Sequence, residues 1–243
     1  MIKILNGKIR VLVDMKAKLK INDHLTNPST IRLVGDIKDV LYDPSKLKIS
    51  HEDPIYFVFR NVSITEENER ILTQMNIRHD ITVITTKKLG LEPCRTHGHY
   101  HPVRDVGYGE IYQVYYGKAA FILQRRIGEG KVDDIVVFIA KKGEAIYIPP
   151  NYGHTTYNIG EDLLVLGNLV GTGFTSDYEE YKKLRGPVVY ILDNGEIIYN
   201  TRYESVKTLR INPKEFIFKP KKYILEDFIG KPEEYKKLLY VKV

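Results

Sequence analysis

Short runs of β-branched and aromatic residues, separated by turn residues, fill the middle of this chain. The runs occupy residues 81–85, 110–116, 119–124, 134–140, 145–148, 163–166 and 188–192. Turn sequences such as Gly117-Lys118 and Asp193-Asn194-Gly195 lie between them. Many short strands at roughly ten- to fifteen-residue spacing favour a sandwich or barrel over βαβ units. We therefore predict an all-β fold, with β structure throughout this segment.

The regions on either side have different patterns. Before the β-rich segment, polar turn clusters precede a strand predicted over 55–60 and an amphipathic helix over 64–75. At the other end, a proline at position 232 predicts a short terminal helix over 231–240. We interpret the chain as one domain. Residues 1–78 form an N-terminal extension packing on the barrel, residues 79–204 form the barrel core, and residues 205–243 form a basic, aromatic C-terminal extension.

The positive charge of the chain is concentrated in that C-terminal extension. The formal net charge is +6, and residues 205–243 contribute +5 of it, with ten Lys or Arg against five Asp or Glu. Basic residues interleaved with aromatic ones can form an RNA surface. No nucleic-acid-binding motif accompanies them, however, and a Lys-, Ile- and Tyr-rich chain with one cysteine is typical of heat-adapted proteins. We expect no nucleic-acid partner, and expect the aromatic side chains to pack on the barrel or across a dimer interface.

Other features indicate a cytoplasmic protein without a membrane partner. The longest apolar run, residues 135–140, is too short to span a bilayer. The first residues alternate polar and apolar types and have no cleavage site typical of a signal peptide. Cys94 is the single cysteine, so no internal disulfide can form.

Histidines cluster in the predicted β-region. His97, His99 and His101 occur two residues apart, and His154 lies on a later predicted strand. Because side chains two apart on a strand point to one face, we expect the first three to share a face of one strand. Glu110 begins the next predicted strand and is close enough in sequence to join them. Two imidazoles and a carboxylate form a site for a divalent transition metal.

A barrel can supply a fourth ligand from far along the chain, because its strands face each other across the interior. His154 is the candidate. Twist at the strand end is expected to keep His97 out of the metal site. The remaining histidines lie in polar, turn-like sequences and are expected to face solvent: His24, His51 and His79.

These motifs resemble those of a known superfamily. The segments 98–101, 110–112 and 149–158 look like the two cupin motifs, and the longer string that begins at Thr82 and includes residues 88–92 is similar to the cupin-type glucose-6-phosphate isomerases of archaea. The similarity runs from about residue 30 to about residue 203. The resemblance implies a cupin double-stranded β-helix, a jelly-roll barrel, with N-terminal strands and a short helix and a short C-terminal helical extension. It also implies a metal-dependent isomerase of glycolysis and gluconeogenesis that interconverts glucose 6-phosphate and fructose 6-phosphate.

The resemblance further implies roles for particular residues. The divalent metal, Fe²⁺ first, with Mn²⁺, Ni²⁺ or Zn²⁺ as substitutes, is held by His99, His101, Glu110 and His154. The phosphate lies near Thr82, Thr96 and the backbone of Gly98, and the sugar lies between Tyr56, Tyr112 and Tyr178. Hydroxyl and backbone N–H donors on a Thr-x-Gly turn suit a phosphate, and glycine permits its close approach. Two positions depart from the family pattern, with Ser176 in place of a histidine and Asn151 in place of an aromatic residue.

Aldose–ketose isomerisation moves a hydrogen between C1 and C2, which needs a polarised carbonyl and a base. Glu110 is the predicted base, working through a cis-enediol, with Tyr112 donating a hydrogen bond to a sugar oxygen. A hydride shift between the two carbons fits the same residues. Three other functions stay open: isomerisation of mannose 6-phosphate, alone or in addition, a cupin dioxygenase, and a non-catalytic sugar-binding protein. The expected partner is a small sugar phosphate, and the expected assembly is a homodimer.

Overall fold

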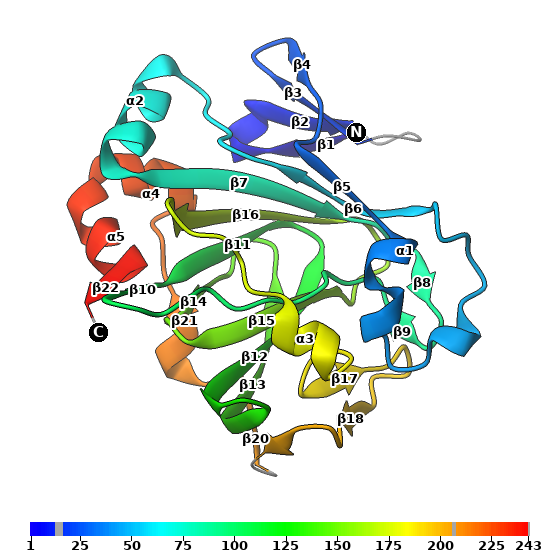
Figure 1. Ribbon diagram of the computed structural model, residues 1–243. Coiled ribbons are helices and arrows are strands. Elements are labelled where there is room, and N and C mark those ends of the chain that lie inside the picture. Colours follow the sequence, from blue (N-terminus) through cyan, green and yellow to red (C-terminus); the bar gives the residue numbers. More distant parts are fainter. Residues whose placement is uncertain (13–16, 206–207, 243) are drawn as a thin grey trace.

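The computed structural model describes residues 1–12, 17–205 and 208–242, and two β-sheets form its centre (Figure 1). The larger sheet has the strand order β21-β14-β11-β16-β7-β6-β5. Its strands are β5 (Thr30–Leu33), β6 (Pro54–Phe59), β7 (Ile77–Ile84), β11 (Glu110–Tyr116), β14 (Ala145–Ile148), β16 (Leu164–Gly171) and β21 (Ile217–Phe218). The smaller sheet has the order β15-β12-β13-β19, and β20 also pairs with β13. Its strands are β12 (Lys118–Gly128), β13 (Lys131–Lys141), β15 (Tyr152–Asn158), β19 (Glu204–Ser205) and β20 (Leu209–Ile211).

The central core lies between these two sheets. One cluster of buried side chains combines Ile84 and Leu166 from the larger sheet with Phe121, Leu123 and Val136 from the smaller one. Because side chains alternate along a strand, each sheet contributes one face to this core. The prediction of a mainly β fold with a barrel at its centre is confirmed.

The outer face of the larger sheet is covered by both ends of the chain. A four-stranded antiparallel sheet covers part of it: β1 (Ile2–Ile4), β2 (Ile9–Leu12), β3 (Lys18–Ile21) and β4 (His24–Thr26). Two C-terminal helices, α4 (Ile224–Gly230) and α5 (Pro232–Leu239), lie beside it near β7 and β16 (Figure 1). Phe228 and Tyr235 from these helices are buried in the same cluster as Tyr115 and Leu169 of the sheet. The aromatic residues of the C-terminal extension therefore pack on the barrel.

Local sequence signals explain the helix ends. In α2 (Glu66–Met75), Oγ1 of Thr65 accepts a hydrogen bond from the Asn68 N–H at 3.2 Å, and Asn76 ends the helix in the left-handed region at φ 54°. Pro232 occupies the first turn of α5, where its missing N–H costs nothing. Both helices were predicted from sequence. No helix in the described part of the chain has the length and apolarity required to span a bilayer.

The prediction of β structure throughout the central segment is wrong in one place. A short helix, α3 (Glu179–Lys183), follows the last long strand of the larger sheet. Its sequence favours a helix because acidic residues occupy its first turn and lysines its last, and Lys182 pairs with Glu179 at 3.0 Å.

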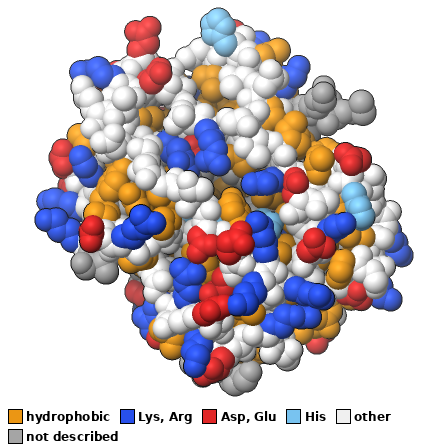
Figure 2. Space-filling model, viewed as in Figure 1, with side chains coloured by type: hydrophobic (Ala, Val, Ile, Leu, Met, Phe, Trp, Pro, Cys, Tyr) orange, Lys and Arg blue, Asp and Glu red, His pale blue; other side chains and the backbone are white. Residues whose placement is uncertain are grey.

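The other small elements are α1 (Val34–Ile37), β8 (Lys88–Leu89), β9 (Glu92–Pro93), β10 (Val106–Tyr108), β17 (Val189–Ile191), β18 (Ile197–Tyr199) and β22 (Tyr240–Lys242). Figure 2 shows acidic and basic side chains interspersed over one face of the molecule.

His79 does not face solvent, which corrects the expectation from its polar sequence neighbours. It is fully buried on β7, where Nδ1 lies 2.8 Å from the Val62 carbonyl oxygen and Nε2 lies 3.0 Å from the Tyr115 hydroxyl. Both partners are distant in sequence, so the local pattern around His79 could not reveal them. His24 and His51 are exposed, as expected.

We predict that His79 makes stability depend on pH. Burial lowers the pKa of His79 below the usual 6.5, so the folded state favours the neutral ring. The contribution of this ring to the free energy of unfolding is therefore present above pH 6.5 and is lost as the pH falls below it. The free energy of unfolding of the native chain, relative to that of H79Q, should therefore fall between about pH 7 and about pH 5. Urea unfolding at both pH values measures this difference. H24Q, at an exposed position, is the control, and an H79Q difference that stays constant with pH would contradict the prediction.

Candidate metal centre

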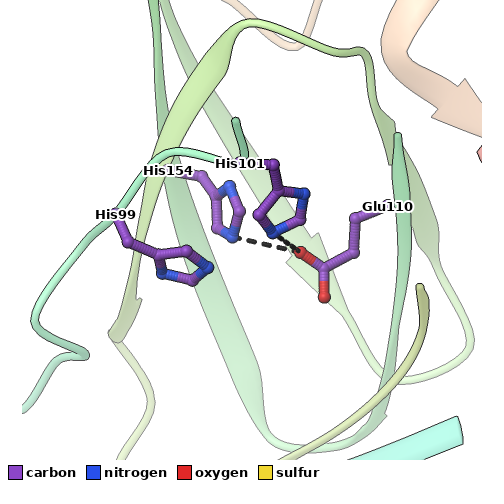
Figure 3. A group of neighbouring side chains, drawn as sticks. All are labelled: His99, His101, Glu110 and His154. Carbon is purple, nitrogen blue, oxygen red and sulfur yellow. Dashed lines mark ion pairs between the residues drawn. The ribbon is translucent and has the colours of Figure 1, made fainter. Parts of the chain in front are cut away.

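The four predicted metal ligands come from three chain segments that meet at one end of the barrel. Glu110 is the first residue of β11 in the larger sheet, and His154 lies within β15 of the smaller sheet. His99 lies beside His154, because the two residues exchange backbone hydrogen bonds of 3.2 Å and 3.0 Å. His101 follows two residues later. The side chains point toward one another (Figure 3).

The segment that carries His99 and His101 is not the regular strand that was predicted. It makes isolated bridges at Arg95, His99 and Tyr100, and Gly98 interrupts it with φ +89°. The turn at Gly98 separates His97 from the other histidines. Nδ1 of His97 contacts the Gly98 carbonyl oxygen, and its ring packs edge-on against Tyr178. His97 therefore lies outside the cluster, while the two-residue spacing still brings His99 and His101 together.

The ligand atoms of the cluster lie close enough to share one ion. His99, His101, Glu110 and His154 each offer one atom, and all of these atoms lie within 4.8 Å of one another. Oε2 of Glu110 is 3.3 Å from Nε2 of His101 and 3.2 Å from Nε2 of His154. Three imidazoles and one carboxylate form a donor set that suits divalent transition metals.

Unsatisfied polar atoms indicate that the cluster fits a cation. Oε2 of Glu110 and both ring nitrogens of His154 are buried, yet they have no hydrogen-bond partner among the described residues. Their separations are short, but the geometry does not satisfy a hydrogen bond. Buried polar atoms without partners cost free energy. A divalent ion would satisfy Oε2 and a lone pair of His154 together.

Neighbouring groups orient the ligands. Nδ1 of His101 lies 3.2 Å from the carbonyl oxygen of Tyr108, which favours the tautomer that leaves the Nε2 lone pair facing Glu110. The amide of Asn168 donates to Oε1 of Glu110 at 2.7 Å, leaving Oε2 toward the histidines. Asn168 was not predicted from sequence. It lies on β16 opposite Tyr112, a register that no local motif reveals.

The protonation states also suit a metal. Burial lowers the pKa of His101 to about 4 and holds the pKa of His99 well below its usual range, so both rings are neutral near pH 7. For Glu110, burial raises the pKa, but the neighbouring rings of His154 and His101 outweigh it, and the pKa is lowered. The rings of His99 and His101 are therefore neutral and the carboxylate of Glu110 is ionised, the forms that bind metal.

The residues expected around the substrate line the same pocket as the cluster. They are Tyr56, Thr82, Thr96, Gly98, Tyr112 and Tyr178. Oγ1 of Thr96 accepts a hydrogen bond from the Thr156 N–H at 3.0 Å, so its own proton is available to a ligand. Gly98 cannot be replaced easily, because an added Cβ would lie 2.2 Å from Oγ1 of Thr155. The N–H of Gly98 donates to no described residue.

A buried ion pair supports this turn. Arg95 is fully buried and donates from Nε to Oε1 of Glu92 at 2.8 Å and from Nη1 to the Thr96 carbonyl oxygen at 3.0 Å. Glu92 also accepts from the Tyr157 hydroxyl at 3.0 Å. Fully hydrogen-bonded buried charges fix local geometry, because breaking the pair leaves an uncompensated charge. The ion pair therefore holds Thr96 and Gly98 in place beside the pocket.

Comparison with known proteins identifies the family. A model of the glucose-6-phosphate isomerase (GPI) family matches residues 31–208, which is most of the chain. The chain belongs to this family. The glucose-6-phosphate isomerase of Pyrococcus abyssi is 26% identical over 179 residues, covering 72% of this chain and 88% of the relative. That of Thermococcus gammatolerans is 27% identical over 168 residues, covering 69% of this chain and 82% of the relative.

Solved structures that are similar to part of this GPI family member include an oxalate decarboxylase and a vicilin. A Bacillus subtilis oxalate decarboxylase mutant has a TM-score of 0.36 and 20% identity, covering 50% of this chain and 28% of that one. A vicilin from Capsicum annuum has a TM-score of 0.34 and 13% identity, covering 50% of this chain and 29% of that one.

The pocket of this GPI family member also contains charged residues that sequence reasoning missed. Arg32, Arg60, Arg78 and Asp80 line it together with the cluster. They lie on β5, at the end of β6 and on β7, where alternate residues point to the same face. The alternating polar residues of segment 78–82 could have indicated a polar face on this strand. That this face lies opposite Glu110 depends on strand pairing, which the sequence does not show.

Tyr112 lies where it can contact both the cluster and a ligand. Its ring centroid is 5.9 Å from that of His154, and its burial, together with the charge of Glu110, holds its pKa well above the usual range. The hydroxyl therefore keeps its proton and can donate a hydrogen bond. Ser176, the departure from the family pattern, lines the pocket as well.

Proposed function

We propose that this protein is a metal-dependent glucose-6-phosphate isomerase, which interconverts glucose 6-phosphate and fructose 6-phosphate. The observation that carries the proposal is the convergence of His99, His101, Glu110 and His154 within 4.8 Å in a pocket that also holds Thr82 and Thr96. Membership of the GPI family supports it. The polar donors of the pocket favour a phosphorylated sugar over the aromatic substrate of a dioxygenase.

We propose that the four residues hold one divalent ion, with Fe²⁺ as the first candidate and Mn²⁺, Ni²⁺ or Zn²⁺ as substitutes. When bound, such an ion acts as a Lewis acid toward the carbonyl and hydroxyl oxygens of the sugar. Glu110 is the one carboxylate of the cluster, and the neutral rings of His99 and His101 leave the charge of such an ion largely uncompensated. This arrangement favours the polarisation that isomerisation needs.

Glu110 is the proposed base. A carboxylate offers about four lone-pair positions, and the amide of Asn168 uses one of them. Positions therefore remain for both a ligand bond and a proton. Glu110 takes the proton from C2 of the aldose and returns it to C1, and the hydroxyl proton moves from O2 to O1. The Tyr112 hydroxyl donates a hydrogen bond to a sugar oxygen. The sugar lies between Tyr56, Tyr112 and Tyr178.

The phosphate is proposed to bind Thr82, Thr96 and the N–H of Gly98. We expect Thr96→Ala to raise the KM for fructose 6-phosphate by about 10-fold with little change in kcat, because a hydrogen bond to a charged group is lost far from the reacting carbons. Steady-state kinetics measures both constants. T96S, which keeps the hydroxyl, should restore the KM. Loss of bound metal in T96A with an unchanged KM would contradict this placement.

A coupled assay tests the function itself. Protein stripped with a chelator and reloaded with Fe²⁺ should convert fructose 6-phosphate to glucose 6-phosphate, which a glucose-6-phosphate dehydrogenase then oxidises with a change in absorbance. Chelation should abolish the signal. Mannose 6-phosphate, supplied in a parallel reaction, measures the related isomerase activity. Absence of turnover with every reloaded metal would contradict the proposal.

We further propose a cytoplasmic role in glycolysis or gluconeogenesis, as a homodimer without nucleic-acid or membrane partners. The single cysteine, Cys94, is buried and free, which fits a reducing compartment. Light scattering of the full chain measures its mass in solution.

A further inference from the structure

Three charged residues in the pocket have no role in the proposed reaction. Asp80 is buried on β7, and its Oδ2 accepts hydrogen bonds from Nε of Arg78 at 2.8 Å and from Nη1 of Arg60 at 3.4 Å. Its Oδ1 accepts from the Asn61 N–H at 3.1 Å. One carboxylate thus holds two guanidinium groups, and the three side chains have a net charge of +1.

The register of the larger sheet places these residues at the metal-cluster end of the pocket. Glu110 pairs with Val170, and Val170 pairs with Arg78, so Glu110 and Arg78 lie in one row across three strands. Thr82, which belongs to the proposed phosphate site, lies four residues beyond Arg78 on the same face of β7. At about 3.3 Å per residue, their Cα atoms are about 13 Å apart, and both side chains shorten this span. Arg78 and the phosphate site therefore lie at opposite ends of the bound sugar.

The guanidinium groups have donors left for a ligand. Among the described residues, the side chain of Arg78 donates one hydrogen bond, from Nε to Asp80. Both of its terminal nitrogens can therefore donate to a ligand. The side chain of Arg78 is 20% exposed and that of Arg60 is 43% exposed, and both line the pocket.

We propose that Arg60 and Arg78 form a second anion subsite, which binds sugar phosphates that carry a further anionic group, carboxylate or phosphate, at carbon 1. The orientation of such a ligand rests on the proposed function, which places the first phosphate at Thr82, Thr96 and Gly98. Guanidinium groups bind both kinds of anion with paired N–H donors. Asp80 holds the two groups in place before a ligand arrives, which lowers the entropy cost of binding. The subsite selects inhibitors or effectors that have an anion at each end.

Calorimetry on the metal-free protein tests the subsite without turnover. Two matched pairs of probes differ only in the second anion: glucitol 6-phosphate with gluconate 6-phosphate, and mannitol 1-phosphate with mannitol 1,6-bisphosphate. We expect the second member of each pair to bind about 10-fold more tightly than the first. The two pairs separate a carboxylate from a phosphate as the preferred group.

Variants assign the preference to the arginines. R60Q and R78Q should each reduce, several-fold, the preference for the probe that carries a second anion. The affinity for the probes with one phosphate and no second anion should be nearly unchanged. R125Q removes an arginine that pairs with Asp133 outside the pocket and serves as the control for loss of one positive charge. Because R78Q leaves Asp80 with fewer donors, R78K provides a second variant that keeps the charge, and melting curves check that each variant folds.

Two outcomes overturn the inference. In the first, the native protein binds both members of each probe pair with equal affinity. In the second, the R60Q/R78Q double variant still prefers the probe with a second anion. Neither outcome affects the proposed isomerase, which the coupled assay measures separately. Conversely, a preference that the arginine variants abolish, in a protein without isomerase turnover, would support the subsite and reject the proposed activity.

Discussion

Replacing His154 with alanine should abolish high-affinity metal binding. The change removes one of three imidazoles and leaves the buried Oε2 of Glu110 with one neighbour fewer. Metal affinity should fall by about 100-fold or more, and isomerase turnover should fall with it, since even the loss of a residue outside the ligand set costs about 10- to 100-fold. Elemental analysis of the purified variant, followed by titration with Mn²⁺, measures the change.

His97 provides the matched control for this substitution. It lies in the same pocket and is also buried, yet it lies outside the cluster. H97A should therefore keep its metal. If H154A retained a full equivalent of tightly bound metal, or if H97A lost it, the proposed ligand set would be wrong.

Replacing Glu110 with glutamine should reduce kcat by about 100- to 10,000-fold per bound metal ion, because glutamine has nearly the same shape but cannot accept the proton. Its carbonyl oxygen can still act as a ligand, so turnover must be divided by the metal content of each preparation. Steady-state kinetics in the coupled assay measures the loss. E161Q, at an exposed glutamate, should have no effect.

Solvent deuterium separates the two mechanisms that the residues permit. If Glu110 carries the proton, product formed in deuterated water should contain deuterium on carbon, and E110Q should not form such product at a comparable rate. If E110Q kept a turnover per metal ion within about tenfold of the native value, and its product contained no deuterium on carbon, Glu110 would not be the base. That result would favour the hydride shift.

The sequence predicted the features that depend on local pattern. The strands over 110–116 and 145–148 have the observed ends, because alternating apolar residues and flanking turns define them. The cluster of His99, His101 and Glu110 followed from close spacing along the chain, even though the turn at Gly98 replaces the predicted strand. The barrel expected from the strand pattern supplied His154 as the fourth ligand, and the resemblance to a known family implied the same residue.

Features that depend on strand pairing were not predicted. Asn168 contacts Glu110 across 58 positions in sequence, and Asp80 binds Arg60 across 20. The burial of His79 depends on Tyr115, which is 36 residues away. In each case the interaction depends on the register between strands, and many registers are compatible with the same alternating pattern.

The mutual backbone bonds of His99 and His154 bring together segments that are 55 residues apart, and Glu110 adds a third segment. An ion shared by all of them would act as a removable cross-link, closing loops whose entropy otherwise favours the unfolded chain. Cells short of the metal would then lose more than activity, because the empty enzyme would open more often and become a better substrate for proteases. Supply of the metal would in this way set how long each molecule survives.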